Sequence, residues 1–283
     1  MAQNVELLGS YWTLAGGAMP HTDKDYSPFD FKDRVETAAK TGFKGIGIWH
    51  TDLAHTLKTR SLKEMRQILD YNGIKHFELE FLTGWFLDGE ERKESDEWRK
   101  LLFTAAEALG ARHVKVGHFV KDPAPMSRLI ESYATLCAEA ANHGTKILFE
   151  LMPFGMIDTL TDTMTMIRGA GAKNGGVIFD LWHLVKLGIS YDDVARVVGQ
   201  CEVGVELNDG TFKCPWDLHE DTINHRRLCG EGEFDVKGFV AKMLKAGYNG
   251  PWGIEVLNAE LRKVPLKEVV KRAFTTTMAQ FPR

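Results

Sequence analysis

The chain of 283 residues is 44% hydrophobic and 26% charged, an ordinary composition for a globular protein with an extensive core. Its net charge of -4, without a basic patch, argues against nucleic acid as a partner. No apolar stretch approaches the roughly 20 residues that cross a bilayer, and the amino terminus lacks a signal segment, so no membrane partner is expected. Four scattered cysteines are typical of reduced thiols, which predicts a cytoplasmic protein.

Short apolar runs alternate with amphipathic helical segments along the chain. Apolar residues recur at spacings of three and four over residues 31–40, 61–71 and 96–109, which indicates helices. Glycines such as Gly42 and Gly110 follow these segments closely, where a helix stops and turns. The runs expected to form strands are Val5–Leu8, Gly45–Trp49, His76–Phe81, His113–Gly117, Lys146–Leu151, Gly176–Phe179, Glu202–Leu207 and Trp252–Val256.

Eight strand–helix units in a chain of this length predict an α/β fold, the (β/α)₈ or TIM barrel. Because no linker or low-complexity tract divides the sequence, residues 1–283 are expected to form one domain. The alternative is an open, doubly wound sheet, which is less favoured because no glycine-rich phosphate loop follows the first strand. Residues 230–233 are rich in glycine but follow a long loop, so we expect a turn there.

Acidic residues lie at the carboxyl ends of the last four predicted strands. Carboxyl ends of barrel strands form the active face, and side chains from neighbouring strands can meet there. Several buried carboxylates would repel one another unless a cation lay among them. A single acid of this kind is more simply a helix cap or a loop ion pair, but four at matched positions predict one divalent metal ion. Oxygen ligands favour Mn²⁺ or Mg²⁺, with Co²⁺ or Zn²⁺ as alternatives. The expected ligands are Glu150, Asp180, Glu206 and Glu255.

Histidine and lysine side chains accompany these acids. His183 lies just beyond the sixth strand, as a metal ligand or a substrate hydrogen-bond donor, while His50 ends the second strand and His118 follows the fourth. Lys115, within the fourth strand, has two open placements. It either reaches the barrel mouth or an acid such as Glu80, or it extends its stem toward the outer helices.

Aromatic residues gather at or after the strand ends. Rings at a barrel mouth stack on the apolar faces of sugars, although loop packing is the plainer interpretation of any single ring. These aromatic residues are Trp49, Phe81, Trp85, Phe86, Phe154 and Trp182. Of this set Trp49 and Trp182 are the predicted substrate-binding residues, together with His50 and Arg226.

Four motifs of the second half resemble the xylose-isomerase-like barrel superfamily of sugar isomerases and epimerases, which also contains inosose and 3-dehydroshikimate dehydratases. They are Phe149-Glu150, Asp180-Leu181-Trp182-His183, Glu206-Leu207-Asn208-Asp209 and Trp252-Gly253-Ile254-Glu255. The resemblance implies that Glu150, Asp180 and Glu255 bind a divalent metal, and that the two glutamates act as acid–base groups. One position departs from the family pattern, because Glu206 stands where the small epimerases usually have histidine.

The chemistry that fits these residues is proton abstraction next to a carbonyl, through a metal-stabilised enediolate. Glu150 and Glu255 would move the proton, His183 and Arg226 would hold substrate oxygens, and Lys115 or His118 would donate a proton. The sequence thus predicts a divalent-metal-dependent sugar isomerase or epimerase.

Two other functions remain open. A metal-dependent lyase or dehydratase would use the same first half-reaction for β-elimination on a keto-sugar, a 3-keto-glycoside or a cyclic polyol ketone. A non-catalytic sugar-binding barrel is less favoured because the acids are present. In every case the partner is a small carbohydrate. A homo-oligomer is also open, with the predicted helix at 266–281 as a candidate contact.

Overall fold

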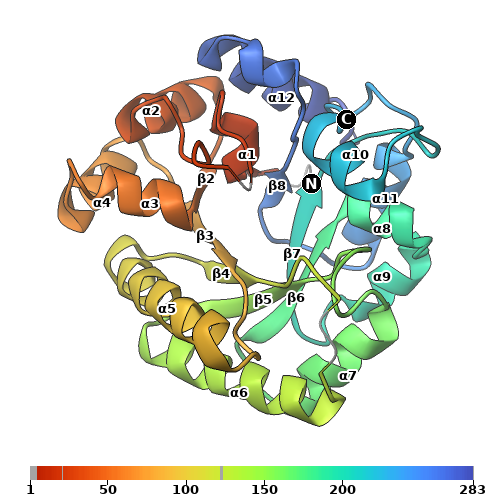
Figure 1. Cartoon of the computed structure of the whole chain (residues 1–283). Helices are drawn as coiled ribbons and strands as arrows, with labels where there is room; N and C mark the ends of the chain where they lie inside the picture. The colour runs from red at the N-terminus through yellow and green to blue at the C-terminus, as the bar shows by residue number, and fades with distance from the viewer. Residues whose placement is uncertain (1–4, 21, 122–123, 283) are drawn as a thin grey trace.

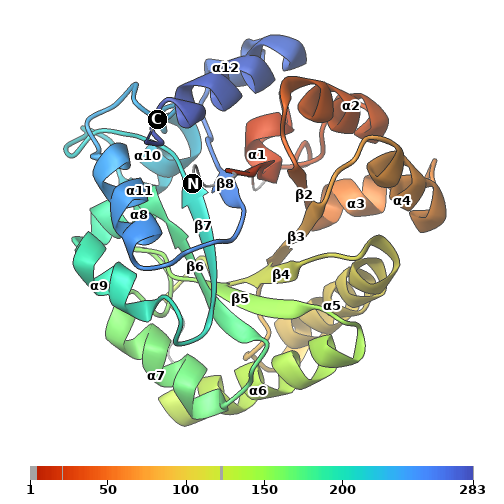
Figure 2. The same cartoon turned by 180° about the vertical axis from the view of Figure 1, so that it is seen from behind.

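The computed structural model describes residues 5–20, 22–121 and 124–282. Eight parallel strands follow one another in chain order around a closed barrel, and β8 pairs with β1. Figure 1 and Figure 2 show the helices as a ring outside the strands. The strands are β1 Leu7–Gly9, β2 Gly45–Trp49, β3 His76–Leu82, β4 His113–Val116, β5 Lys146–Glu150, β6 Gly175–Asp180, β7 Glu202–Leu207 and β8 Trp252–Ile254.

The helices cover the outer faces of the strands, where the main apolar core lies. Among the described residues, no helix is both long and apolar enough to cross a membrane. The helices are α1 Tyr11–Leu14, α2 Phe31–Thr41, α3 His50–Thr56, α4 Leu62–Tyr71, α5 Gly89–Leu109, α6 Met126–Asn142, α7 Leu160–Ala170, α8 Leu181–Leu187, α9 Tyr191–Val197, α10 Leu218–Asn224, α11 Val236–Lys245 and α12 Leu266–Met278, with a 3₁₀ turn at Leu261–Lys263.

The predicted TIM barrel is confirmed, and closure between β8 and β1 excludes the open sheet. Helix α4 shows why the local pattern sufficed. Ser61 and Glu64 form a reciprocal capping box at its start, and Met65 and Leu69 are buried on its inner face. Helix α5 begins earlier than predicted, because its first two turns are polar and give no apolar periodicity. The turn expected at residues 230–233 is present.

Alternate residues of each strand point into the barrel, as the two-residue period requires. Two glycines make room there for acidic side chains. A Cβ atom at Gly47 would lie 2.3 Å from Glu80 Oε1, and one at Gly253 would lie 3.0 Å from Glu206 Cγ. The barrel interior is therefore filled partly by charged side chains instead of the branched aliphatic ones usual in this fold.

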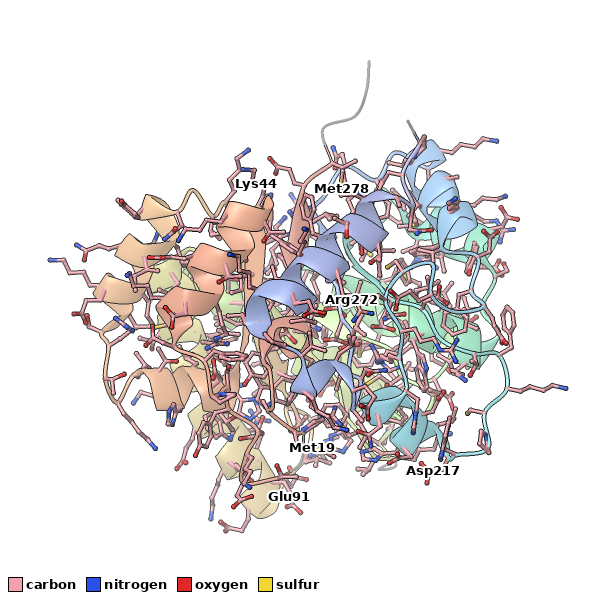
Figure 3. All side chains as sticks on the ribbon, turned by 90° about the horizontal axis from the view of Figure 1, so that it is seen from above. Met19, Lys44, Glu91, Asp217, Arg272 and Met278 are labelled. Carbon is pink, nitrogen blue, oxygen red and sulfur yellow. The ribbon has the colours of Figure 1, made fainter. Side chains whose placement is uncertain are left out.

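The loops that follow the strands gather at one end of the barrel. In Figure 3, Met19 and Asp217 of these loops lie at the end opposite Lys44 and Met278. Lys44 directly precedes β2 and so marks the amino ends of the strands. The acids at the carboxyl ends of β5 to β8 therefore lie at the same end of the barrel as Met19 and Asp217.

Candidate active site

The four acids predicted as metal ligands converge at the carboxyl ends of β5 to β8. Glu150, Asp180, Glu206 and Glu255 are buried, and each offers a carboxylate oxygen within 4.8 Å of the others. Strand register explains part of this meeting, because Asp180 on β6 lies directly beside Glu206 on β7. Oxygen ligands around one ion are separated by similar distances, roughly 3–5 Å.

Asp180 is held by three neighbours. It ends β6 and caps helix α8, accepting the backbone N–H of His183 at 3.1 Å. Its Oδ2 atom accepts hydrogen bonds from Asn208 Nδ2 at 2.9 Å and Arg226 Nη1 at 2.8 Å. Burial acts to raise the pKa of Asp180, but Arg226 and the other donors outweigh it and lower that pKa. Asp180 is therefore ionised and fixed in position.

Lys115 occupies the centre of the carboxylate cluster. Its Nζ atom lies 2.5 Å from Glu206 Oε1, 3.0 Å from Glu255 Oε1 and 3.3 Å from Glu80 Oε2, with Glu150 Oε2 at 3.8 Å. Burial would lower the pKa of Lys115, but these carboxylates reverse the effect and hold that pKa well above its ordinary value. Of the two placements left open by the sequence, the structure shows the inward one, with Glu80 as a partner.

Of the four acids, Glu206 and Glu255 are the two whose pKa values are raised by burial. Burial, reinforced by Glu255, raises the pKa of Glu206 well above its ordinary value. Burial also raises the pKa of Glu255 to about 8, with Glu150 adding to the rise and Lys115 opposing it. Ser10 Oγ donates to Glu206 Oε1 at 3.0 Å, whereas Glu206 Oε2 is buried without a hydrogen-bond partner among the described residues.

Glu150 has the opposite character. His183 Nε2 lies 3.2 Å from Glu150 Oε1. Burial acts to raise the pKa of Glu150, but Lys115 and His183 outweigh it and lower that pKa. Within the cluster the pKa of Glu150 is thus lowered, whereas those of Glu206 and Glu255 are raised.

Arg226 was predicted to bind substrate, and its guanidinium instead contacts acids while still lining the cavity. Its Nη1 atom donates to Asp180 at 2.8 Å and lies 3.2 Å from Glu255 Oε2, and its Nη2 atom donates to Thr222 Oγ1 at 2.7 Å. The indole of Trp182 lies beneath it, 5.3 Å from the guanidinium carbon. Arg226 is therefore a buried counter-ion of Asp180 and Glu255 at the edge of the cavity.

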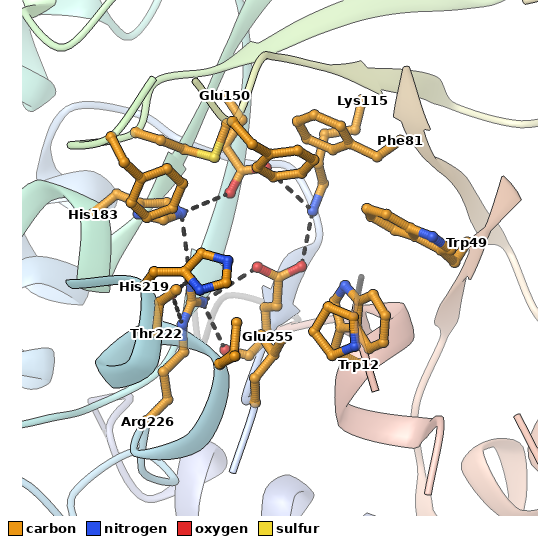
Figure 4. A pocket seen from close by; sticks show the side chains of 16 residues that line it. Trp12, Trp49, Phe81, Lys115, Glu150, His183, His219, Thr222, Arg226 and Glu255 are labelled. Carbon is orange, nitrogen blue, oxygen red and sulfur yellow. Dashed lines mark hydrogen bonds and ion pairs between the residues drawn. The ribbon is translucent and has the colours of Figure 1, made fainter. Parts of the chain in front are cut away.

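A cavity that is partly open to solvent lies over the cluster. Figure 4 shows Glu150 and Glu255 facing each other across its floor, with Lys115 to one side of them and His183 on the other. The walls are largely apolar. Trp12 packs on Trp49 with ring centroids 5.0 Å apart. The wall residues are Trp12, Pro20, Trp49, Phe81, Phe119, Met152, Phe154, Ile223 and Leu257.

Three predicted site residues lie behind these walls and not in the described lining. The ring of His50 accepts the Phe81 N–H at 3.3 Å and packs on Trp98, and burial lowers its pKa to about 4. His118 packs edge-on against a neighbouring ring, and Trp182 is fully buried. Their roles as proton donor or substrate contacts stay predictions.

Other contributors were not predicted from the sequence. Ser10 directly follows β1, Trp12 lies in the short helix α1 that comes next, and Asn208 lies two residues after Glu206. Their positions after strand ends were a usable signal, but serine and asparagine are common in any loop. Phe119 lies in a loop without a recognisable motif, so nothing in the sequence distinguished it.

The residues present fit a divalent cation by charge and donor type. Ionising every buried acid of the barrel interior would leave more negative than positive charge, because the described interior holds six carboxylates against Lys115 and Arg226. Glu206 Oε2 also has no hydrogen-bond partner among the described residues. The carboxylates in question are Glu78, Glu80, Glu150, Asp180, Glu206 and Glu255.

Residues 35–276 match the model of the xylose isomerase-like TIM barrel family, and the chain belongs to that family, as its motifs predicted. It is 26% identical over 252 residues to the 3-dehydroshikimate dehydratase of Pseudomonas aeruginosa, covering 83% of this chain. The chain spans only 37% of the length of that relative. It is 23% identical over 261 residues to the inosose isomerase of Bacillus velezensis, covering 88% of this chain and 91% of the relative.

Solved structures share the fold. An IolI protein with a bound zinc atom superposes with a TM-score of 0.80 at 19% identity, covering 98% of both chains. A D-allulose 3-epimerase from Methylomonas sp. superposes with a TM-score of 0.73 at 14% identity, covering 99% of both chains. At these identities the similarity shows the barrel and does not carry a reaction from one protein to the other.

Proposed function

We propose that this protein is an acid–base enzyme that removes a proton next to the carbonyl of a small sugar or cyclic polyol ketone, as an isomerase or epimerase. The observation that carries the proposal is the pair Glu150 and Glu255, whose carboxylates face each other across the cavity floor with oxygens within 4.8 Å. Two proton-carrying groups on opposite sides of one bound carbon are what such a reaction needs.

The two glutamates have different tasks. Glu150, with its lowered pKa, is ionised near neutral pH and serves as the base. Glu255, whose pKa burial raises, is the more readily protonated of the two and serves as the acid. Environments that push two carboxyl pKa values apart are a common basis for assigning acid and base. The base takes the proton from the carbon next to the carbonyl, and Glu255 returns one from the other side.

The buried cations Lys115 and Arg226 hold the acids of the cavity floor in place. Lys115 and Arg226 hold the acids of the floor through their N–H groups, and His183 lines the floor beside Glu150, where its ring would meet a substrate oxygen. The residues that would hold a divalent ion are Glu150, Asp180, Glu206 and Glu255, and such an ion supplies polarisation of the carbonyl and stabilisation of the enediolate.

The apolar walls supply substrate contact. Trp12 and Trp49 lie together on the side of the cavity opposite His183 (Figure 4). Indole rings stack on the C–H faces of sugars, and they exclude water from the floor. A small carbohydrate fits this combination of an apolar wall and a polar floor, which supports the predicted partner.

A β-eliminating lyase is the second candidate, and one specific observation favours it. The chain matches two 3-dehydroshikimate dehydratases at 25% and 26% identity, in addition to two inosose isomerases. The same base would start the elimination, and Glu255 or Lys115 would protonate the departing oxygen instead of carbon.

Incubation with ketohexoses and inososes in D₂O tests the proposal. An isomerase or epimerase incorporates deuterium next to the carbonyl and yields a stereoisomer or positional isomer, detected by NMR. A lyase yields a conjugated enone that absorbs in the ultraviolet. Absence of both exchange and elimination across the substrate panel, in protein supplied with Mn²⁺, would leave a binding protein and contradict the proposal.

A further inference from the structure

The Nζ atom of Lys115 uses the same carboxylates that would bind a metal ion. An ammonium group has three N–H donors, and three carboxylate oxygens lie within 3.3 Å of this one, on Glu206, Glu255 and Glu80. Lys115 is 1% exposed, so water does not take the place of these partners. The ammonium is fully engaged by acids from three different strand ends.

Two of its three partners, Glu206 and Glu255, belong to the set of candidate metal ligands, and Glu150, a third member of that set, lies 3.8 Å away. A divalent ion bound to the same oxygens at about 2.0–2.5 Å would lie within a few ångströms of Nζ. Like charges at such a distance in a buried site repel strongly. The ammonium in its present place and a metal ion are therefore unfavourable neighbours.

Glu80 offers Lys115 a second position. Its Oε2 atom lies 3.3 Å from Nζ, and its side chain is 0% exposed. Gly47 on β2 provides the space that this carboxylate fills, since a Cβ atom there would come within 2.3 Å of Glu80 Oε1. Glu80 is not among the candidate metal ligands, so it remains available to the ammonium when they are occupied.

We propose that Lys115 is a built-in counter-cation that competes with the divalent ion for Glu206 and Glu255. Without metal it neutralises the cluster and keeps the acids together. When metal binds, the ammonium withdraws toward Glu80 and stays paired there. Glu206 and Lys115 together thus take the place of the neutral histidine that the small epimerases usually have. The lysine weakens metal binding, but it also keeps the cluster stable when no metal is bound. This inference uses the metal of the proposed function but does not depend on turnover.

Binding of Mn²⁺ to Lys115→Met, measured by isothermal titration calorimetry, tests the competition. We expect the variant to bind Mn²⁺ at least about tenfold more tightly than the natural protein, because the repulsion is gone. Without metal its melting temperature should be lower, and Mn²⁺ should raise that temperature more than it does in the natural protein. The matched control is Lys121→Met, which removes an exposed lysine paired with Asp158 and should change neither quantity.

A second variant covers the case in which Lys115→Met does not fold. Glu80→Gln removes the alternative partner while keeping its shape, so the ammonium should remain on Glu206 and Glu255, and Mn²⁺ should bind several-fold more weakly. Equal or weaker Mn²⁺ affinity in Lys115→Met, or unchanged affinity in Glu80→Gln, would overturn the proposal. Because the readout is metal affinity, failure here is distinguishable from failure to find deuterium exchange.

Discussion

Lys115 Nζ and Glu206 Oε1 lie 2.5 Å apart, although 91 positions separate the two residues in the chain. Strand β4 brings the lysine into the barrel interior, and β7 brings the glutamate to the same level. The contact joins the buried ammonium of Lys115 to Glu206. Glu206 is the candidate metal ligand at which this chain has glutamate where the family resemblance leads one to expect histidine. Charge balance in the site therefore depends on both residues together, and substitution of either one changes the environment of the other acids.

Glu255→Gln should lower the rate of α-proton exchange by about 10²–10⁴-fold, because the amide cannot carry a proton between substrate and solvent. The amide oxygen can still accept the Lys115 hydrogen bond, so the fold should persist, as circular dichroism would show. Glu260→Gln, at an exposed glutamate paired with Lys263, is the control and should leave exchange unchanged. Natural exchange rates in Glu255→Gln would remove this residue from catalysis.

Arg226→Met should destabilise the fold by about 3–5 kcal/mol, because two buried carboxylates, Asp180 and Glu255, would each lose a charged partner. The neighbouring variant Arg227→Met provides a matched control, since Arg227 is exposed and its guanidinium contacts only the Glu231 carbonyl among the hydrogen bonds described. Urea denaturation of both variants measures the difference in the free energy of unfolding. Equal stability of the two variants would show that Arg226 is not an essential counter-ion.

Glu78→Gln should change how stability depends on pH. Burial, reinforced by Glu80, raises the pKa of Glu78 from 4.5 to about 8 in the folded protein. The unfolded chain releases this proton near its ordinary pKa, whereas the folded protein keeps it until about pH 8. The stability that this group contributes is therefore complete below the unfolded pKa and is lost as the pH rises through 8.

The glutamine variant cannot titrate, so its free energy of unfolding should rise relative to the natural protein by roughly 2–4 kcal/mol across that window. Urea denaturation of both proteins at about pH 5, 7 and 9 measures this difference in the free energy of unfolding. These pH values span the interval between the unfolded and folded pKa values of Glu78. Parallel stability curves for the two proteins would contradict the raised pKa of Glu78.

Trp12→Leu should weaken sugar binding by about fivefold, because about 1 kcal/mol of stacking between the ring and the sugar would be lost. The turnover rate of bound substrate should change less. Trp12 lines the cavity and packs on Trp49, so its removal opens the wall without touching the acids. Trp216→Leu is the control, because Trp216 stacks on His225 and is not among the described lining residues. A substrate KM that shifts equally in both variants would argue against stacking by Trp12.

The barrel and the meeting of the four acids could be predicted from the sequence. Alternating strand and helix patterns specify βα units, and eight of them close into one known architecture. Once that is known, Glu150, Asp180, Glu206 and Glu255 must share one end, because parallel strands place all their carboxyl ends together. This conclusion needs only the direction of the chain and the order of the strands, and the alternation of strand and helix patterns in the sequence predicts both.

The placement of the remaining charged side chains was decided by tertiary structure alone. Strand β4 is buried on both faces, so its apolar pattern does not tell whether Lys115 points inward or outward. Arg226 lies in a loop segment whose partners, Asp180 and Glu255, are 46 and 29 positions away, and no local signal pairs them. Long flexible side chains reach whichever buried charge the closed barrel brings within range. The sequence therefore determined that acids meet, and only the folded barrel determined which cations meet them.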